Sequence, residues 1–226
     1  MTMPTGELGN NLIGLGVSYV YVFSILLAGK AFVRYGVEAS RKFVHIMVCN
    51  WWLLAMLFFR SPLWAAIPPA SFVVLNWLSY RYGLFDAMER KEGRGDLGTV
   101  YYAISLLVLT RLTFGDESLR FAGGAGILAM GYGDGLAALI GSRTRWKPFR
   151  VFGATRSLSG SLSMWGATFV AVCLLLLFHD AGSAWWIALL AATFATAVEV
   201  MTPMGFDNLT VPLLTAVLVW RLMPAG

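Results

Sequence analysis

Long apolar stretches, separated by short polar segments, extend along almost the whole chain. Most are close to the roughly 20 residues that an α-helix needs to cross the hydrocarbon core of a bilayer. The stretch at 99–113 is short for a full crossing, and a tilted helix or a thinner bilayer would accommodate it. The pattern predicts eight membrane-spanning helices, at residues 11–33, 43–59, 62–80, 99–113, 121–141, 158–178, 184–201 and 208–223.

The composition supports the same interpretation. Of the 226 residues, 58% are hydrophobic and only 13% are charged, whereas a soluble domain has about 25% charged residues. We therefore predict an all-α fold, a polytopic membrane helix bundle that forms a single domain over residues 1–226. Cys49 and Cys173 each lie inside an apolar stretch, which is typical of small buried side chains rather than of disulfide or metal sites.

Basic residues are concentrated in every second connection between these stretches. The first, third and fifth connections carry 13 of the 17 Lys and Arg residues, so the positive-inside rule places them in the cytoplasm and both termini on the outer side. The expected location is an integral, multi-pass one, in the inner membrane if the chain is bacterial. The net charge of +5 is then explained by anionic lipid and not by nucleic acid. These basic residues are Lys30, Arg34, Arg41, Lys42, Arg81, Arg90, Lys91, Arg94, Arg143, Arg145, Lys147, Arg150 and Arg156.

A first group of candidate functional residues lies at the start of the second apolar stretch. A helix beginning near residue 39 would align four polar side chains on one face: Glu38, Arg41, Lys42 and His45. Two cations, a carboxylate and an imidazole on one face suit a phosphate-bearing ligand. The alternatives are a membrane anchor formed by the Arg-Lys pair and an ordinary core histidine.

A second group is Asp134, inside the fifth apolar stretch and surrounded by Gly131, Gly133 and Gly135. A carboxylate at such a position indicates function, because an ionisable group inside a bilayer is costly. Glycines weaken a helix, and broken helices line polar cavities in membrane proteins. Close helix packing is the alternative explanation for the glycines, but it does not explain the aspartate.

Two further groups flank the sixth and eighth stretches. Five cations, including Lys147 and Arg156, precede the small residues Ser157, Gly160 and Ser161. This pattern predicts an anion site at a helix N-terminus, unless the cations only determine the orientation in the membrane.

Near the same face the sequence places Glu199, Asp207 and Asn208. Asp207 alone would be explained as a helix cap, but carboxylates facing a basic loop suggest Mg²⁺ that holds nucleotide phosphates.

Taken together, these segments resemble the CTP-dependent lipid-alcohol kinases, the group of dolichol kinase, phytol kinase and yeast-type diacylglycerol kinase. The matching segments occur in the family's order, at residues 38–46, 98–102, 131–143, 147–162 and 198–213. The resemblance implies transfer of the γ-phosphoryl group of CTP to a membrane alcohol. One departure is Ser159, where the family usually has Glu, and another is Arg156, where it usually has Lys.

The resemblance suggests a division of roles. Asp134, with Glu199 or Asp207, would hold Mg²⁺, and His45 or a carboxylate would accept the hydroxyl proton. The expected phosphate contacts come from Arg41, Lys42, Lys147, Arg156, Ser157, Gly160, Ser161 and Asn208. The partners are CTP, a lipid alcohol and the bilayer. The alternatives are cytidylyl transfer to a phospholipid, whose family signature is not found here, and a non-enzymatic transporter, which usually shows an inverted repeat.

Overall fold

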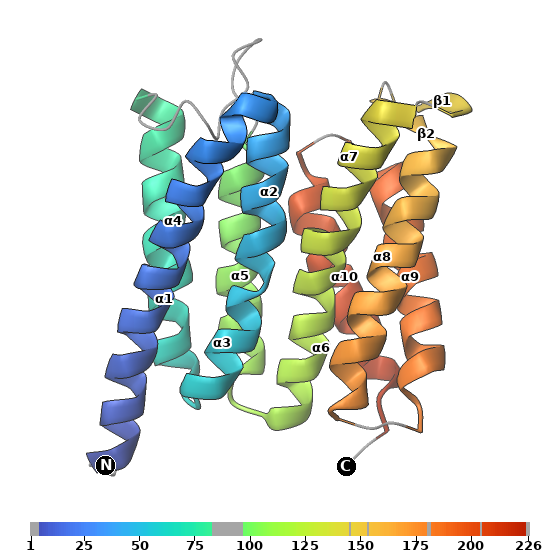
Figure 1. Cartoon of the computed structure of the whole chain (residues 1–226). Coiled ribbons are helices and arrows are strands. Elements are labelled where there is room, and N and C mark those ends of the chain that lie inside the picture. The colour runs from blue at the N-terminus through green and yellow to red at the C-terminus, as the bar shows by residue number, and fades with distance from the viewer. Residues whose placement is uncertain are drawn as a thin grey trace.

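Helices running side by side make up almost all of the computed structural model (Figure 1). It describes residues 5–82, 97–144, 146–152, 154–179, 182–203 and 205–224. The helix α1 begins, and α10 ends, at the same end of the bundle. The helical elements are α1 (Thr5–Phe32), η1 (Val33–Tyr35), α2 (Val37–Cys49), α3 (Trp51–Phe58), α4 (Pro62–Tyr82), α5 (Gly98–Thr113), α6 (Glu117–Leu128), η2 (Ala129–Asp134), α7 (Gly135–Thr144), α8 (Leu158–Leu177), α9 (Ala184–Met201) and α10 (Asp207–Leu222).

Four of the described helices are long and apolar enough to cross a membrane: Glu7–Tyr35, Glu117–Thr144, Leu158–Leu177 and Ala184–Met201. The helix Gly98–Thr113 is apolar but shorter, and the second expected span is divided into α2 and α3 at Asn50. The described ends of the basic connections lie together at the end of the bundle opposite the start of α1 (Figure 1). The count of eight spans and the outward termini stay predictions. Arg90, Lys91, Arg94 and Arg145 lie outside the described residues.

The prediction of an all-α fold is confirmed except for one short connection. The connection between α7 and α8 contains a two-stranded antiparallel hairpin, β1 (Pro148–Val151) and β2 (Ala154–Ser157), in which Phe149 pairs with Arg156. Lys147 and Phe152 adopt positive φ angles of 47° and 46°, which turn the chain into and out of the first strand. The hairpin matters for the site because it places Arg156, in β2, just before the first turn of α8.

The continuous rod formed by α6, η2 and α7 is the core of the bundle. Its apolar window is 72% buried, against 28–39% for the other three long apolar helices. Within it, η2 is a π-helical turn, so the winding of the helix changes next to Asp134 but the helix is not broken. The glycines allow close packing, because a Cβ on Gly131 would clash with Cys49 and one on Gly126 with the carbonyl of Pro212.

Candidate active site

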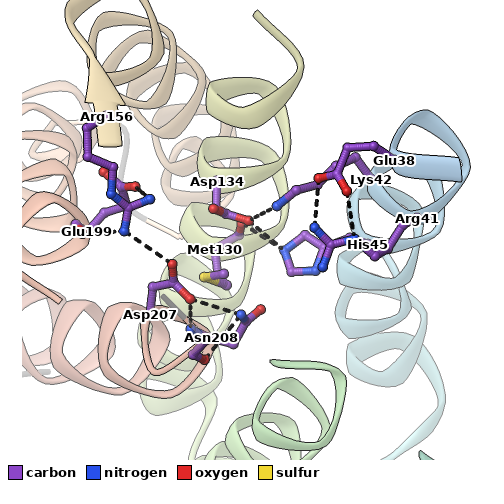
Figure 2. Close-up of polar contacts among 11 residues, drawn as sticks. Glu38, Arg41, Lys42, His45, Met130, Asp134, Arg156, Glu199, Asp207 and Asn208 are labelled. Carbon is purple, nitrogen blue, oxygen red and sulfur yellow. Dashed lines mark hydrogen bonds and ion pairs between the residues drawn. The ribbon is translucent and has the colours of Figure 1, made fainter. Parts of the chain in front are cut away.

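The polar residues singled out in the sequence gather around one cavity at the end of the bundle where α2, α8 and α10 begin (Figure 2). The cavity has a volume of about 620 Å³, within the range of roughly 300–1,000 Å³ that is typical of small-molecule sites. Ten of the twelve predicted site residues line it: Arg41, Lys42, Asp134, Arg156, Ser157, Gly160, Ser161, Glu199, Asp207 and Asn208.

Asp134 and Lys42 form a buried ion pair across the cavity. Lys42 Nζ donates to Asp134 Oδ2 at 2.5 Å, although the two residues are 92 positions apart in the sequence. Asp134 is the last residue of the π-helical turn η2, and Lys42 lies in the second turn of α2. The π-helical turn is a common device at functional sites, and here its last residue meets a helix from a distant segment.

His45 lies one turn further along α2, beside the same carboxylate. Its Nε2 is 3.6 Å from Asp134 Oδ2 and 3.3 Å from the carbonyl oxygen of Met130 (Figure 2). The Met130 contact fixes the ring, because that carbonyl can only accept a hydrogen bond from it. Arg41, next to Lys42 in α2, forms a bidentate ion pair with Glu38, with N–O distances of 2.7 and 3.2 Å. This pair holds the Arg41 guanidinium at the wall of the polar cavity.

Asp134 also belongs to a group of three buried carboxylates in the cavity. One oxygen from each of Asp134, Glu199 and Asp207 lies within 4.8 Å of the others, although they come from η2, α9 and α10. Carboxylate oxygens are the ligands that Mg²⁺ prefers, so the donor set fits such an ion. The Asn208 side chain donates to Asp207 Oδ1 at 3.0 Å and keeps that carboxylate in place.

Arg156 partly neutralises this acidic cluster. Its guanidinium forms ion pairs with Glu199 and, at 3.5 Å, with Asp207. It also donates to the backbone carbonyls of Glu199 and Thr202 at 3.2 and 3.3 Å. Because buried like charges repel one another strongly, Lys42 and Arg156 are the groups that allow three carboxylates to lie this close together.

The first turn of α8 forms the remaining polar wall. Ser157 is the N-cap residue, and its hydroxyl oxygen accepts a hydrogen bond from the Gly160 amide at 3.2 Å. A Cβ on Gly160 would lie 3.2 Å from the carbonyl of Ala137, so glycine allows α7 and α8 to approach each other closely. The amides of a helix N-terminus attract anions, and Ser161 lines the cavity beside them.

Two predicted site residues do not line this cavity. The Lys147 ammonium lies 5.1 Å from the centre of the Trp146 ring, at the base of the hairpin. His45 lines an adjoining apolar cavity instead. Conversely, Ser142 and Thr155 do line the polar cavity and were not singled out in the sequence. Thr155 is in β2, and the sequence contained no clear signal for the hairpin that positions it.

Comparison with known proteins identifies the group to which the chain belongs. No protein-family model matches the chain, and no solved structure matches it. The chain is similar to phytol kinase from Synechocystis sp., with 33% identity over 220 residues that cover 92% of this chain and 91% of that protein. This similarity and the apolar helices indicate an integral membrane protein. The chain belongs to the CTP-dependent lipid-alcohol kinase family that the sequence motifs indicated, and it is a kinase that phosphorylates an alcohol.

Proposed function

We propose that this protein transfers the γ-phosphoryl group of CTP to an isoprenoid alcohol of the phytol type, at the cytoplasmic face of the membrane. The observation that carries the proposal is the polar cavity itself, in which three buried carboxylates meet the buried Lys42 and the partly buried Arg156, from separate segments. The similarity to phytol kinase supports an isoprenoid acceptor. Under this proposal the chain is a multi-pass domain whose basic connections face the compartment that contains CTP.

The acidic and the basic residues around the cavity would hold the nucleotide phosphates in different ways. Asp134, Glu199 and Asp207 would hold Mg²⁺, which neutralises charge on the phosphate oxygens. Lys42 and Arg156 would contact phosphate oxygens, and Arg156 is suited to bidentate contacts by its planar guanidinium. The amides at the start of α8 would receive a further phosphate group.

The chemistry is an in-line displacement at phosphorus. The alcohol oxygen forms a bond to the γ-phosphorus, the bond between that phosphorus and the β–γ bridging oxygen breaks, and CDP leaves with the electron pair. The alcohol proton has to be accepted by a nearby base. His45 would accept it at Nδ1, because Nε2 donates to the Met130 carbonyl, and the Asp134 carboxylate, 3.6 Å from Nε2, would stabilise the protonated ring.

The direct test is a product analysis with the purified protein in lipid micelles. Labelled CTP and labelled ATP are offered separately, with phytol, farnesol, a polyprenol and diacylglycerol as acceptors. We expect a phosphorylated isoprenoid alcohol and CDP from CTP. Pyrophosphate as the second product would instead identify a cytidylyltransferase, and turnover with ATP alone would contradict the choice of nucleotide.

A pair of variants ties the activity to the cavity. Asp134→Asn keeps the shape of the side chain but removes its charge, and we expect turnover to fall by about 100-fold or more. The matched control is Asp116→Asn, because Asp116 caps α6 away from the cavity and asparagine is an equally good cap. Equal turnover in the two variants would rule out the proposed role of Asp134.

A further inference from the structure

A second cavity adjoins the polar one, and most of its lining is apolar. It lies among α1, α2, α4 and α5, and it shares Arg41, Lys42 and Asn208 with the polar cavity. An apolar channel that opens onto charged phosphate-binding residues brings a hydrocarbon chain and a polar head into one continuous site. Its apolar walls include Leu26, Val48, Phe72, Leu75, Ala103 and Leu106.

One residue that lines this apolar cavity, Tyr102, has a hydroxyl group without a described partner. Tyr102 is only 6% exposed, and its hydroxyl forms no hydrogen bond with any residue that the structure describes. The ring of His45 stacks on the Tyr102 ring with centroids 4.5 Å apart, and both residues line the cavity. A buried hydroxyl without a hydrogen bond costs free energy. A ligand atom that forms a hydrogen bond with the Tyr102 hydroxyl would remove that cost.

The apolar cavity is also accessible from the lipid side. The apolar window of α1 is only 28% buried, and Phe23, which lines the cavity, is 49% exposed. A lipid in the bilayer would therefore reach the cavity laterally, past α1, without leaving the hydrocarbon region. The cavity volume is about 110 Å³, far less than that of the polar cavity, so there is room for only the first carbons of one chain, and the rest of the tail would extend past α1 into the lipid.

A third cavity provides a contrast. It is also apolar and is lined by residues such as Leu53, Leu136, Ile140 and Ala167, from α3, α7 and α8. None of its lining residues lines the polar cavity. A lipid bound there would have no described route for its head group into the phosphate site, so the third cavity serves as an internal control.

We propose that the acceptor is a single-chain lipid alcohol whose first carbons lie in the cavity among α1, α2, α4 and α5, with its hydroxyl beside Tyr102 and His45. This inference rests on the proposed function and adds to it where the acceptor binds and which residue positions it. Tyr102 is a positioning residue: it exchanges a hydrogen bond with the acceptor oxygen, while His45 takes the proton.

The first experiment compares two cavity-filling variants. Val48→Phe narrows the acceptor cavity, and Ala167→Phe narrows the third cavity. We expect Val48→Phe to raise the KM for phytol by about tenfold while the KM for CTP is unchanged, because only the lipid loses contact surface. Ala167→Phe should leave both values as in the wild type. Equal effects of the two variants on the phytol KM would overturn the assignment.

Tyr102→Phe tests the positioning role separately. Loss of one hydrogen bond should raise the KM for phytol by about fivefold, again without an effect on the KM for CTP. The melting temperature should stay the same or rise, because the hydroxyl has no described partner to lose. A lower melting temperature with an unchanged phytol KM would show that the hydroxyl is structural.

A labelling experiment distinguishes this inference from the proposed function. An isoprenoid alcohol with a diazirine on its tail is photolysed with the wild-type protein, and the labelled peptides are mapped. We expect labels in α1, α2, α4 and α5, competed by phytol and not by diacylglycerol. Labels in α7 and α8, or competition by diacylglycerol, would refute the inference. If the wild type phosphorylates no alcohol, the proposed function fails, but the map still decides where the alcohol binds.

Discussion

Removal of the Arg156 guanidinium is the most informative change at the acidic cluster. Arg156→Met preserves much of the side-chain length but leaves Glu199 and Asp207 without their described cation. It also removes the donors to the carbonyls of Glu199 and Thr202. The three carboxylates would then face one another within 4.8 Å with only Lys42 to balance them.

The magnitude follows from the burial of these groups. The side chains of Arg156, Glu199 and Asp207 are 14%, 5% and 7% exposed, so little water is available to screen the remaining charges. Breaking a buried ion pair by removing one partner costs about 3–5 kcal/mol. For a chain of this length, that loss lowers the melting temperature by about 6–20 °C.

The assay is thermal unfolding in detergent with and without Mg²⁺. Because the variant has more uncompensated negative charge, added Mg²⁺ should raise its melting temperature more than that of the wild type. Arg156→Lys serves as the control: it keeps the charge and should recover part of the stability. If Arg156→Met melts like the wild type and responds equally to Mg²⁺, the charge-balance argument is wrong.

Three further predictions use the same geometry. Lys42→Met should reduce turnover by about 100-fold, whereas Lys42→Arg should retain measurable activity, as followed by CDP release. Gly131→Ala should destabilise the protein by about 1–3 kcal/mol in thermal unfolding, because the new Cβ would clash with Cys49, while Gly166→Ala should not, because nothing lies near that position. Chelation with EDTA should abolish CDP release, and Mg²⁺ should restore it more fully than Ca²⁺, since the two ions differ in size and coordination.

The helices of this protein are predictable from the sequence because a bilayer leaves few alternatives. An apolar stretch of about 20 residues can satisfy its backbone in lipid only as a helix. The expected stretches at 121–141 and 158–178 correspond to the rod of α6, η2 and α7 and to α8. The break between α2 and α3 at Asn50 was not predicted, since the composition does not change there.

The sequence predicted only in part that acidic and basic residues lie together. The positive-inside rule assigns the alternate connections to one side of the membrane, which predicts that Asp134, Glu199 and the start of α8 share one end of the bundle. The individual partners were not predictable. Arg156 lies between Glu199 and Asp207 because the β1–β2 hairpin positions the residues that precede α8. Strands of four residues leave no recognisable pattern in the sequence, so this hairpin was not predicted.

The charges around the polar cavity support the proposal that a divalent cation binds there together with the nucleotide. Among the described residues that line the cavity, four formal negative charges, from Glu38, Asp134, Glu199 and Asp207, face three positive ones. A triphosphate brings additional negative charge into a buried space, where repulsion is poorly screened. The described side chains therefore cannot balance the nucleotide alone, and a divalent ion on the carboxylates would supply the missing charge while Lys42 and Arg156 turn from the carboxylates to the phosphates.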